Sequence, residues 1–448
     1  MGTASSRRDR PVERSLWLDQ LGDTGRRPAL VGTVDADVAI VGAGYSGLWT
    51  AYYLLRHSPG SRLVVLDREH VGFGASGRNG GWAVGEVARH DIPPAMTRAL
   101  FDAVAEIGRV CVTEGIECGY TRGGTIRLAR TAPQLKRQRA EVRHAHAQGF
   151  GEDDLRMLSA DEAGELLAAP DVQGGLFFAH TAAIQPLALA RGLAAAVERL
   201  GGVIYEGTEV TSVSAGRVAT GGGTVRAGAV VQATEAYGPG RGHVPLYSQM
   251  IATEPLPASA WESIGLAGRP TFADDRYVVI YGQRTADDRI AFGARGNPAY
   301  LYGSRIRAEV ESKAHLAIAA TLRELLPQLG DVEVTHRWGG VLAVPRDWHP
   351  HVRWDAASRA GSLGGYVGDG VAASNLAGRT LADLIVGNDT ERATFPWVNH
   401  RSRRWEPEPL RWLAVNAAFT ALAWSDRREA RTGNPSQLAR QVLRLIGR

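Results

Sequence analysis

The feature that most constrains the fold is a glycine-rich turn between an apolar run and an amphipathic stretch near the N-terminus. Residues 38–41 (VAIV) are apolar and partly β-branched, as is typical of a buried parallel strand. Gly42, Gly44 and Gly47 follow with the spacing GxGxxG, and apolar residues then recur at helical spacing up to a Pro-Gly pair. A second apolar run ends at Asp67. The sequence therefore predicts a strand–turn–helix–strand unit.

This unit has the pattern of a dinucleotide-binding site. Gly42 permits the tight turn, Gly44 lets the backbone approach a pyrophosphate, and Gly47 lets the helix pack closely on the strand. The N-terminus of the helix presents free N–H groups and the positive end of its dipole to the phosphates. Asp67 can accept hydrogen bonds from ribose hydroxyls. The predicted contacts in this unit are Gly42, Ala43, Gly44, Tyr45, Ser46, Gly47, Asp67 and Arg68.

The segment after the second strand distinguishes the candidate dinucleotides. An acid at position 67 disfavours a 2′-phosphate and hence NADP, which leaves NAD and FAD. An NAD dehydrogenase would continue with further strand–helix units, whereas this chain continues with GFGASGRNGG (72–81). We interpret that stretch as backbone lying along FAD. Its predicted cofactor contacts, with the residue that follows it, are Ala75, Ser76, Arg78, Asn79, Gly80, Gly81 and Trp82.

Several separated segments within residues 35–395 resemble the FAD-dependent D-amino-acid-oxidase superfamily, which includes glycine oxidase and sarcosine oxidase. Besides the two segments above, they are IQPLALARGLAAAVERLGGVIYEGTEVTSV (184–213), AVVQATEAYGP (229–239) and GGYVGDGVAASNLAGRTLADLI (364–385). The resemblance implies that these segments contact the adenine side, the nucleotide and the flavin ring. The further cofactor contacts are Glu209, Val210, Ala233, Thr234, Gly340, Gly368, Asp369, Gly370, Val371 and Ala372.

The resemblance also implies the architecture, an α/β fold with a discontinuous, Rossmann-like FAD-binding domain of the GR2 type. A second, substrate domain is built on a β-sheet, and the C-terminal tail is helical. The sequence patterns agree, because 276–295 reads as a hairpin and 304–327 as one amphipathic helix. The predicted boundaries are 30–95, 180–245 and 335–395 for the FAD-binding domain, 96–179 and 246–334 for the substrate domain, and 396–448 for the tail.

Two segments narrow the resemblance within the superfamily. YSQMIATEPLP (247–257) and WEPEPLRWL (405–413) are similar to the gamma-glutamylputrescine oxidoreductase branch. That similarity implies oxidation of a C–N bond of an amine or amino acid to an imine, by hydride transfer to flavin N5. The substrate itself does not carry over from so broad a branch.

The segment GDGVAASNLAGR is predicted to stabilise negative charge on the flavin ring, because a helix beginning near Val371 would aim its N-terminus there. Asp369 raises a question, since an acid that points inward would disfavour an anionic ring. The C-terminal half contains no Cys, and no His lies between His70 and His90. We therefore predict non-covalent FAD.

The electron acceptor stays open between oxygen and another acceptor. The two lysines of the chain, Lys136 and Lys313, both lie in segments with helical patterning. Neither is placed to act beside flavin N5, which favours a dehydrogenase or an oxidase with a different oxygen site.

Candidate substrate contacts lie on the predicted hairpin and in the segment HRWGG. A carboxylate is best held by arginine, which is bidentate and permanently charged. The candidates are Tyr281, Arg284, Arg295 and Trp338. No residue is identified as catalytic, because the cofactor carries the redox step and the protein supplies position and field.

Composition argues against several other classes of protein. The chain has 51 Lys and Arg against 47 Asp and Glu, and the arginines are scattered among acids, so we expect no nucleic-acid partner. His349 and His351 have a poor spacing for metal ligands, so no metal is predicted. Cys111 and Cys118 cannot form a disulfide framework, which favours a cytoplasmic protein. Residues 410–424 are too short for a bilayer span, so we expect a packed helix and no membrane contact.

Two alternative functions remain. GDGVA is similar to the Gly-Asp turn of flavin-dependent hydroxylases, and rapid consumption of NAD(P)H would support that alternative. The chain could also be a flavin-bearing subunit of a larger complex without independent turnover, with its basic tail as the docking surface. Obligate co-purification with a partner would point to that second alternative.

Overall fold

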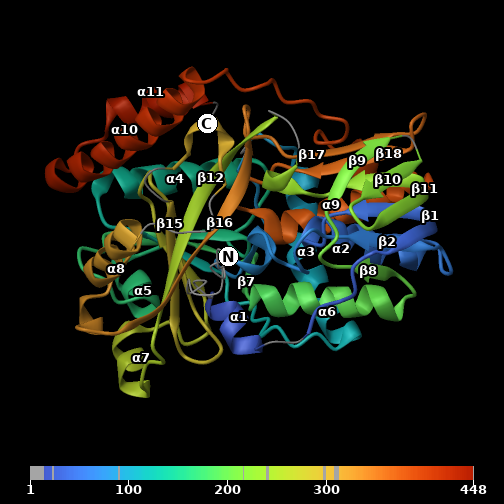
Figure 1. The fold of residues 1–448 in the computed structure, drawn as a ribbon. Coiled ribbons are helices and arrows are strands. Elements are labelled where there is room, and N and C mark those ends of the chain that lie inside the picture. Colours follow the sequence, from blue (N-terminus) through green and yellow to red (C-terminus); the bar gives the residue numbers. More distant parts are fainter. Residues whose placement is uncertain are drawn as a thin grey trace, which may run out of the picture.

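The computed structural model contains two large β-sheets side by side, with helices packed around them (Figure 1). It describes residues 15–22, 25–88, 91–214, 216–238, 242–295, 299–306 and 312–446. The α/β class predicted from the sequence is confirmed, because helices alternate with strands and the first sheet is mostly parallel.

The first sheet is built on the dinucleotide-type unit. Its central strand pairs in parallel with one neighbour on each side, and residues 38–41 face both 229–232 and 63–66. These apolar runs are buried on both faces, which explains their lack of polar alternation. The strands in order are β17 (His351–Asp355), β18 (Ala360–Gly364), β11 (Gly223–Gln232), β1 (Gly32–Val41), β2 (Leu63–Leu66) and β8 (Val203–Tyr205), with β10 (Arg217–Thr220) paired to β11 and to β9 (Val210–Ser214).

The second sheet is antiparallel except for one parallel pair, β13 with β4. The predicted hairpin at 276–295 is confirmed as β14 and β15, which pair antiparallel. Its strands in order are β16 (Val334–Pro345), β12 (His243–Thr253), β15 (Ile290–Arg295), β14 (Ile280–Arg284), β13 (Thr271–Asp274), β4 (Thr125–Ala129), β6 (Gly174–Phe178) and β5 (Leu155–Leu158). A separate pair is β3 (Trp82–Val84) with β7 (Thr181–Ala183).

The helices around the first sheet share one large hydrophobic core. At its centre the helices after β1 and β18 approach closely, because a Cβ on Gly378 would lie 2.7 Å from the Cβ of Trp49. These central helices are α2 (Tyr45–His57), α3 (Pro94–Glu114), α6 (Pro186–Arg199) and α9 (Gly370–Val386). The others are α1 (Leu16–Leu21), α4 (Ala132–Ala147), α5 (Ala160–Leu166), α7 (Ala258–Ile264), α8 (Ser312–Leu325), α10 (Leu410–Thr432) and α11 (Gln437–Ile446), with short 3-10 turns η1 (Ala75–Gly77), η2 (Glu235–Tyr237), η3 (Tyr302–Ser304), η4 (Pro327–Leu329) and η5 (Glu391–Thr394).

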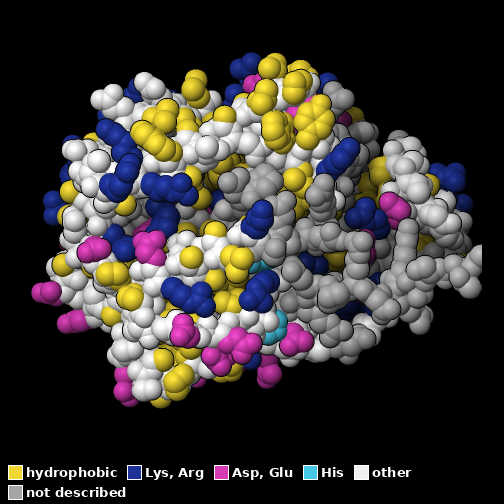
Figure 2. Space-filling model, turned by 60° about the vertical axis from the view of Figure 1, so that its left-hand side comes forward, with side chains coloured by type: hydrophobic (Ala, Val, Ile, Leu, Met, Phe, Trp, Pro, Cys, Tyr) yellow, Lys and Arg dark blue, Asp and Glu magenta, His cyan; other side chains and the backbone are white. Residues whose placement is uncertain are grey.

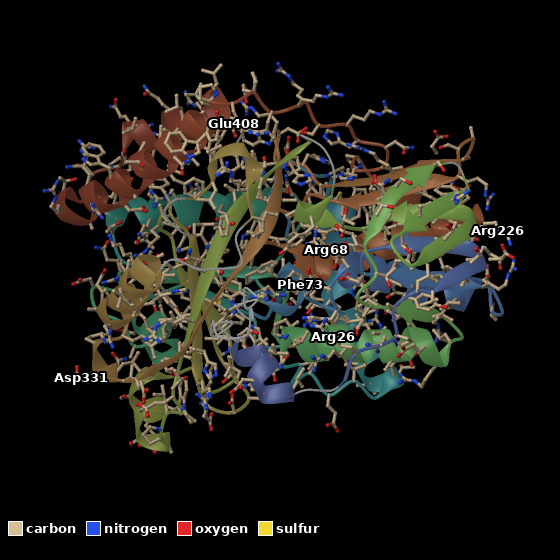
Figure 3. All side chains as sticks on the ribbon, viewed as in Figure 1. Arg26, Arg68, Phe73, Arg226, Asp331 and Glu408 are labelled. Atoms are coloured by element: carbon tan, nitrogen blue, oxygen red, sulfur yellow. The ribbon has the colours of Figure 1, made fainter. Side chains whose placement is uncertain are left out.

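The C-terminal helices α10 and α11 lie over one end of the second sheet (Figure 1). Glu408, labelled in Figure 3, lies just before α10 and accepts hydrogen bonds from the Tyr300 hydroxyl at 2.6 Å and the Gly303 N–H at 3.1 Å. It also pairs with Arg411 at 3.0 Å. The tail is therefore fixed to the body by polar contacts as well as by apolar packing.

The predicted start of the third FAD-binding segment, residue 335, lies within β16, which pairs with β12 in the second sheet. The predicted helix over 304–327 is shorter, since α8 covers Ser312–Leu325, and residues 307–311 lie outside the described part of the chain. The domain boundaries themselves stay a prediction.

The surface carries both signs of charge. Figure 2 shows Lys and Arg side chains interspersed with Asp and Glu over one face of the molecule. Among the described helices, none combines the length and the apolar character needed to cross a membrane. The described residues also contain no group of three or more His, Cys, Asp or Glu side chains arranged to hold a metal ion.

Candidate functional site

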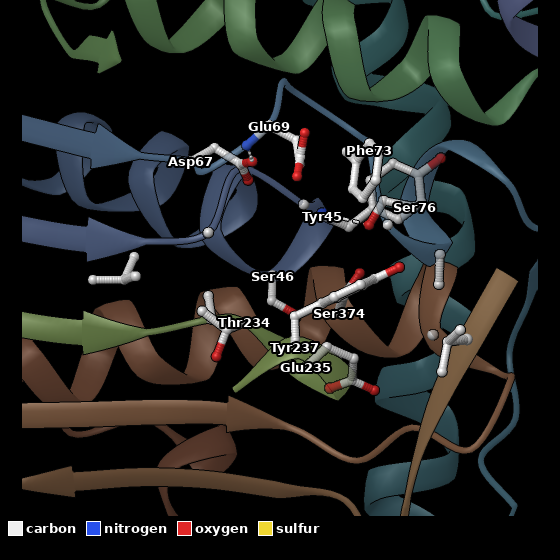
Figure 4. A pocket seen from close by; sticks show the side chains of 18 of the residues that line it. Tyr45, Ser46, Asp67, Glu69, Phe73, Ser76, Thr234, Glu235, Tyr237 and Ser374 are labelled. Atoms are coloured by element: carbon white, nitrogen blue, oxygen red, sulfur yellow. Dashed lines mark hydrogen bonds between the residues drawn. The ribbon is translucent and has the colours of Figure 1, made fainter. Parts of the chain in front are cut away.

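A cavity of about 1,220 Å³ runs along the carboxyl ends of the central strands of the first sheet (Figure 4). We call it the first cavity. Its walls come from seven segments: the GxGxxG turn, the loop after β2, the glycine-rich loop, residues 208–210, the loop after β11, β16 at 341–342 and the start of α9 with the turn before it. The carboxyl edge of a parallel sheet is where open α/β folds bind ligands.

The glycine turn requires glycine on steric grounds. Gly42 has a φ of +110°, and a Cβ there would lie 2.5 Å from the carbonyl oxygen of Ala233. A Cβ on Gly47 would overlap the carbonyl oxygen of Gly42. Gly44 is the N-cap of α2 and has no capping side chain, so the N-terminus of the helix faces the cavity. This arrangement is an anion-binding site.

Asp67 lies at the other side of the turn and is fixed by backbone donors. Its carboxylate accepts hydrogen bonds from the N–H groups of Ala43 and Glu69, both at 2.8 Å. Burial raises the pKa of Asp67, although these N–H groups oppose the shift. Arg68 and Phe73 lie beside the same cavity, between the two halves of the molecule in Figure 3.

A second cavity of about 750 Å³ adjoins the first and shares part of its wall. The two cavities have Ala75, Asn79, Leu342, Gly368 and Val371 in common. We refer to it as the second cavity. Because α9 begins at this shared wall, its N-terminus lies where the two cavities meet.

Three polar side chains of the second cavity, Ser248, Tyr281 and Arg295, come from the second sheet. Tyr281 Oη and Ser248 Oγ lie 2.6 Å apart, and burial raises the pKa of Tyr281. Arg295 donates from Nη2 to the Val367 carbonyl at 2.8 Å. Asp369, whose orientation the sequence left open, lines this second cavity and is absent from the lining of the first. The site therefore combines a guanidinium and a carboxylate.

The predicted cofactor contacts separate into three groups. Most line the first cavity, some line only the second, and some line neither. Lining the first are Gly42, Gly44, Tyr45, Ser46, Asp67, Arg68, Ala75, Ser76, Asn79, Val210, Ala233, Thr234, Gly368, Gly370 and Val371. Lining only the second are Arg78, Gly80, Trp82, Gly340 and Asp369. Lining neither are Ala43, Gly47, Gly81, Glu209 and Ala372.

The residues in that last group contribute in other ways. Ala43 and Gly47 shape the turn, as described above. Gly81 packs against the Gln283 side chain, so that no Cβ could be accommodated. Glu209 has a side chain that is 67% exposed and lies 4.0 Å from Arg68. Ala372 is fully buried in the core.

Two of the four predicted substrate contacts lie away from the site. Tyr281 and Arg295 line the second cavity, whereas Arg284 pairs with Asp288 at 2.6 Å. Because successive residues of a strand alternate faces, Arg284 points away from the face that carries Tyr281. Trp338 is fully buried and donates its indole N–H to the Arg78 carbonyl at 2.9 Å.

Sequence reasoning missed Glu235, which lines the first cavity (Figure 4). Its carboxylate accepts a hydrogen bond from the Gly365 N–H at 2.9 Å. Burial raises the pKa of Glu235 to about 7. The segment ATEAYGP was recognised as part of the nucleotide site, but only its Ala233 and Thr234 were selected. The sequence signal that could have identified Glu235 is that it is the acidic residue in a segment whose other members are neutral.

Replacing Glu235 by Gln is expected to remove a pH-dependent cost to stability. The pKa of about 7 lies above the ordinary 4.5, so the folded protein binds this proton more tightly than the unfolded chain. The free energy of unfolding therefore falls as the pH rises from 4.5 to 7. At pH values above that window, Glu235→Gln should be more stable than the parent by about 3 kcal/mol, with no difference below it.

The measurement is thermal unfolding of both proteins across this pH range. Glu69→Gln serves as the control, since Glu69 lines the same cavity but has a side chain that is 36% exposed. Equal pH dependence in Glu235→Gln and the parent protein would contradict the assignment.

Residues 37–384 match the family described as DAO, FAD dependent oxidoreductase. The chain belongs to this family. It is therefore a FAD-dependent oxidoreductase, and the match spans both cavities. The family assignment agrees with the resemblance that the motifs indicated.

Individual relatives support the assignment over most of the chain. The protein is 30% identical over 419 residues to gamma-glutamylputrescine oxidoreductase of Escherichia coli (strain K12), covering 87% of this chain and 93% of that protein. It is 28% identical to glycine oxidase of Geobacillus kaustophilus (strain HTA426), covering 81% and 97%. The crystal structure of a glycine oxidase from Geobacillus kaustophilus superposes with a TM-score of 0.71 at 21% identity, covering 83% of this chain and all of that one. The predicted fold is thereby confirmed.

FAD, the cofactor of the family, fits the first cavity on three structural observations. The cavity is elongated enough to be lined from the turn after β1 to the start of α9, and its lining is mostly apolar or backbone. The N-terminus of α2 at Gly44 has no N-cap side chain, although the Tyr45 N–H donates to the Ser76 hydroxyl at 2.9 Å, and it lies at the cavity for a pyrophosphate. Asp67 offers a fixed carboxylate for a ribose. The start of α9 lies at the far end, where the second cavity opens. The described linings of the two cavities contain neither Cys nor His, the two residue types whose side chains could bind a flavin covalently.

Proposed function

We propose that the protein oxidises the C–N bond of a small amine or amino acid that carries a carboxylate. The observation that carries this proposal is the presence of both Arg295 and Asp369 on the wall of the second cavity. Arginine is the natural partner of a substrate carboxylate, and a carboxylate is the natural partner of an ammonium group. The cavity adjoins the site of FAD, so a substrate held there lies next to the cofactor.

The residues have separate roles in this proposal. When bound, FAD accepts a hydride from the carbon next to the amine nitrogen. Arg295 holds the substrate carboxylate, and Tyr281 and Ser248 form the polar wall beside it. Trp82 and Leu342 close the cavity and exclude water. The N-terminus of α9 places its positive dipole end between the two cavities.

The substrate nitrogen must lose a proton before its carbon can give up a hydride. Four titratable side chains line the described part of the second cavity: Arg78, Tyr281, Arg295 and Asp369. Arginines stay protonated, and burial raises the pKa of Tyr281 above its usual range. Asp369 is the one remaining side chain among these four that can accept a proton. We therefore assign it the role of general base.

Asp369→Asn should lower kcat/KM by about a hundredfold at neutral pH, the usual effect of losing a general base. The loss should shrink as the pH rises and the free amine becomes deprotonated in solution. The pH profile of flavin reduction, measured with one substrate in both proteins, checks this. An equal loss at every pH would show that Asp369 does not accept the proton.

The proposed function itself is tested by anaerobic mixing of the purified yellow protein with a panel of amines and of D- and L-amino acids. Loss of the visible flavin absorption with at least one of them is expected. Subsequent admission of oxygen distinguishes an oxidase from a dehydrogenase. Neither Lys136 nor Lys313 lines either cavity, so an oxygen site, if present, uses other residues.

A further inference from the structure

A third cavity lies between the second sheet and the two C-terminal helices. We call it the tail chamber, and its volume is about 630 Å³. Most of its lining is apolar and comes from β12, β16, α10, α11 and the segments beside them. The largest apolar side chains in the lining include Trp348, Trp405, Phe419, Leu422, Leu443 and Ile446. The chamber therefore has the apolar character of a pocket for an organic ligand.

The tail chamber adjoins the second cavity. Val279 and Arg295 line both of them, so these two side chains form the partition. The Arg295 N–H bonds to the Val279 carbonyl at 3.4 Å, which fixes the two residues side by side. Arg295 Nη2 is held by the Val367 carbonyl. A ligand whose carboxylate pairs with Arg295 therefore has an apolar space next to that contact.

The C-terminal helix α10 fixes this partition in place. The Asp426 carboxylate accepts hydrogen bonds from the N–H groups of Tyr277 at 2.7 Å and Val278 at 2.9 Å. Glu429 accepts from the Tyr277 hydroxyl at 2.7 Å. These contacts determine the path of the chain into Val279. The tail thus builds the back wall of the site.

We propose that the tail chamber binds an apolar extension of the substrate. The substrate class is then an amino acid or carboxylated amine that bears an alkyl, acyl or aryl chain. This substrate class rests on the function proposed above, whereas the apolar binding site itself does not. Burial of the chain in the chamber supplies affinity in proportion to its apolar area.

The test uses ligands that are not oxidised. Acetate, butyrate, hexanoate and octanoate are titrated into the FAD-loaded protein, and binding is followed by the change in the visible flavin spectrum. The dissociation constant should fall about threefold to fourfold for each added methylene until the chamber is filled. A dissociation constant that does not fall with chain length, or no binding by octanoate, overturns the proposal.

Two neighbouring alanines of α10 provide a matched pair of variants. Ala418 lines the tail chamber, whereas Ala417 is exposed on the other side of the helix. Ala418→Phe should weaken octanoate relative to acetate by at least about tenfold, and Ala417→Phe should leave that ratio unchanged. Equal ratios in the two variants overturn the proposal. These results need no turnover, so they stand apart from a failure of any amine to reduce the flavin.

Discussion

Gly44→Asp is expected to abolish retention of FAD while leaving the protein folded. Gly44 caps α2 and lines the first cavity, and a Cβ there meets only the hydroxyl of Ser76, at 2.9 Å. The new carboxylate would occupy the anion site at the helix N-terminus and repel the pyrophosphate. Repulsion between unit charges about 4 Å apart is about 4 kcal/mol at an effective dielectric constant of 20, so the dissociation constant should rise by about a thousandfold.

The measurement is the flavin content of the purified variant, followed by titration of the apoprotein with FAD. Gly221→Asp is the matched control, because Gly221 lies outside the lining of the cavity, has no positive φ and has nothing within 4 Å of its Cβ position. Gly221→Asp should retain FAD. A Gly44→Asp protein that also retains FAD would contradict the placement of the pyrophosphate.

Arg295→Met is expected to cause the largest loss on the substrate side. Removing one partner of a buried, hydrogen-bonded charge pair costs about 2–5 kcal/mol, so kcat/KM for a carboxylated substrate should fall by about a hundredfold or more. An amine without a carboxylate should lose much less. The Met side chain keeps a similar apolar stem, so the change removes mainly the charge.

Arg284→Met is the matched control for this prediction. Arg284 belongs to the same hairpin but pairs with Asp288 and stacks over Trp261, with its Cζ 4.3 Å from the ring centroid. Steady-state kinetics with a carboxylated amine and its decarboxylated counterpart should change in Arg295→Met alone. Equal losses for both substrates in Arg295→Met would mean that the arginine does not bind the carboxylate.

The cofactor side of the molecule could be predicted from the sequence because its signals are local. The turn Gly42–Gly47 is fixed by clashes between atoms a few residues apart or on the adjacent strand. Asp67 follows its strand directly, so its position depends on one pairing, β1 with β2. Short motifs of this kind predict both the fold and the dinucleotide.

The substrate side depends on contacts that are distant in sequence. Sequence patterns gave Arg284 and Arg295 equal weight, and only the pleat and register of β14 and β15 distinguish them. The burial of Glu235 arises from β18, more than a hundred residues later. The tail chamber depends on hydrogen bonds between α10 and residues 277 and 278, which come just before β14 and lie about 150 residues earlier in the chain. No local pattern reports such pairings.

The most direct test of the central claim is a single turnover without oxygen. A limiting amount of an amine or amino acid from the responding panel is mixed with the yellow protein, and the loss of flavin absorption is compared with the carbonyl product formed after hydrolysis of the imine. The account predicts one equivalent of carbonyl product for each flavin bleached. It is contradicted if no amine bleaches the flavin while NADH or NADPH does.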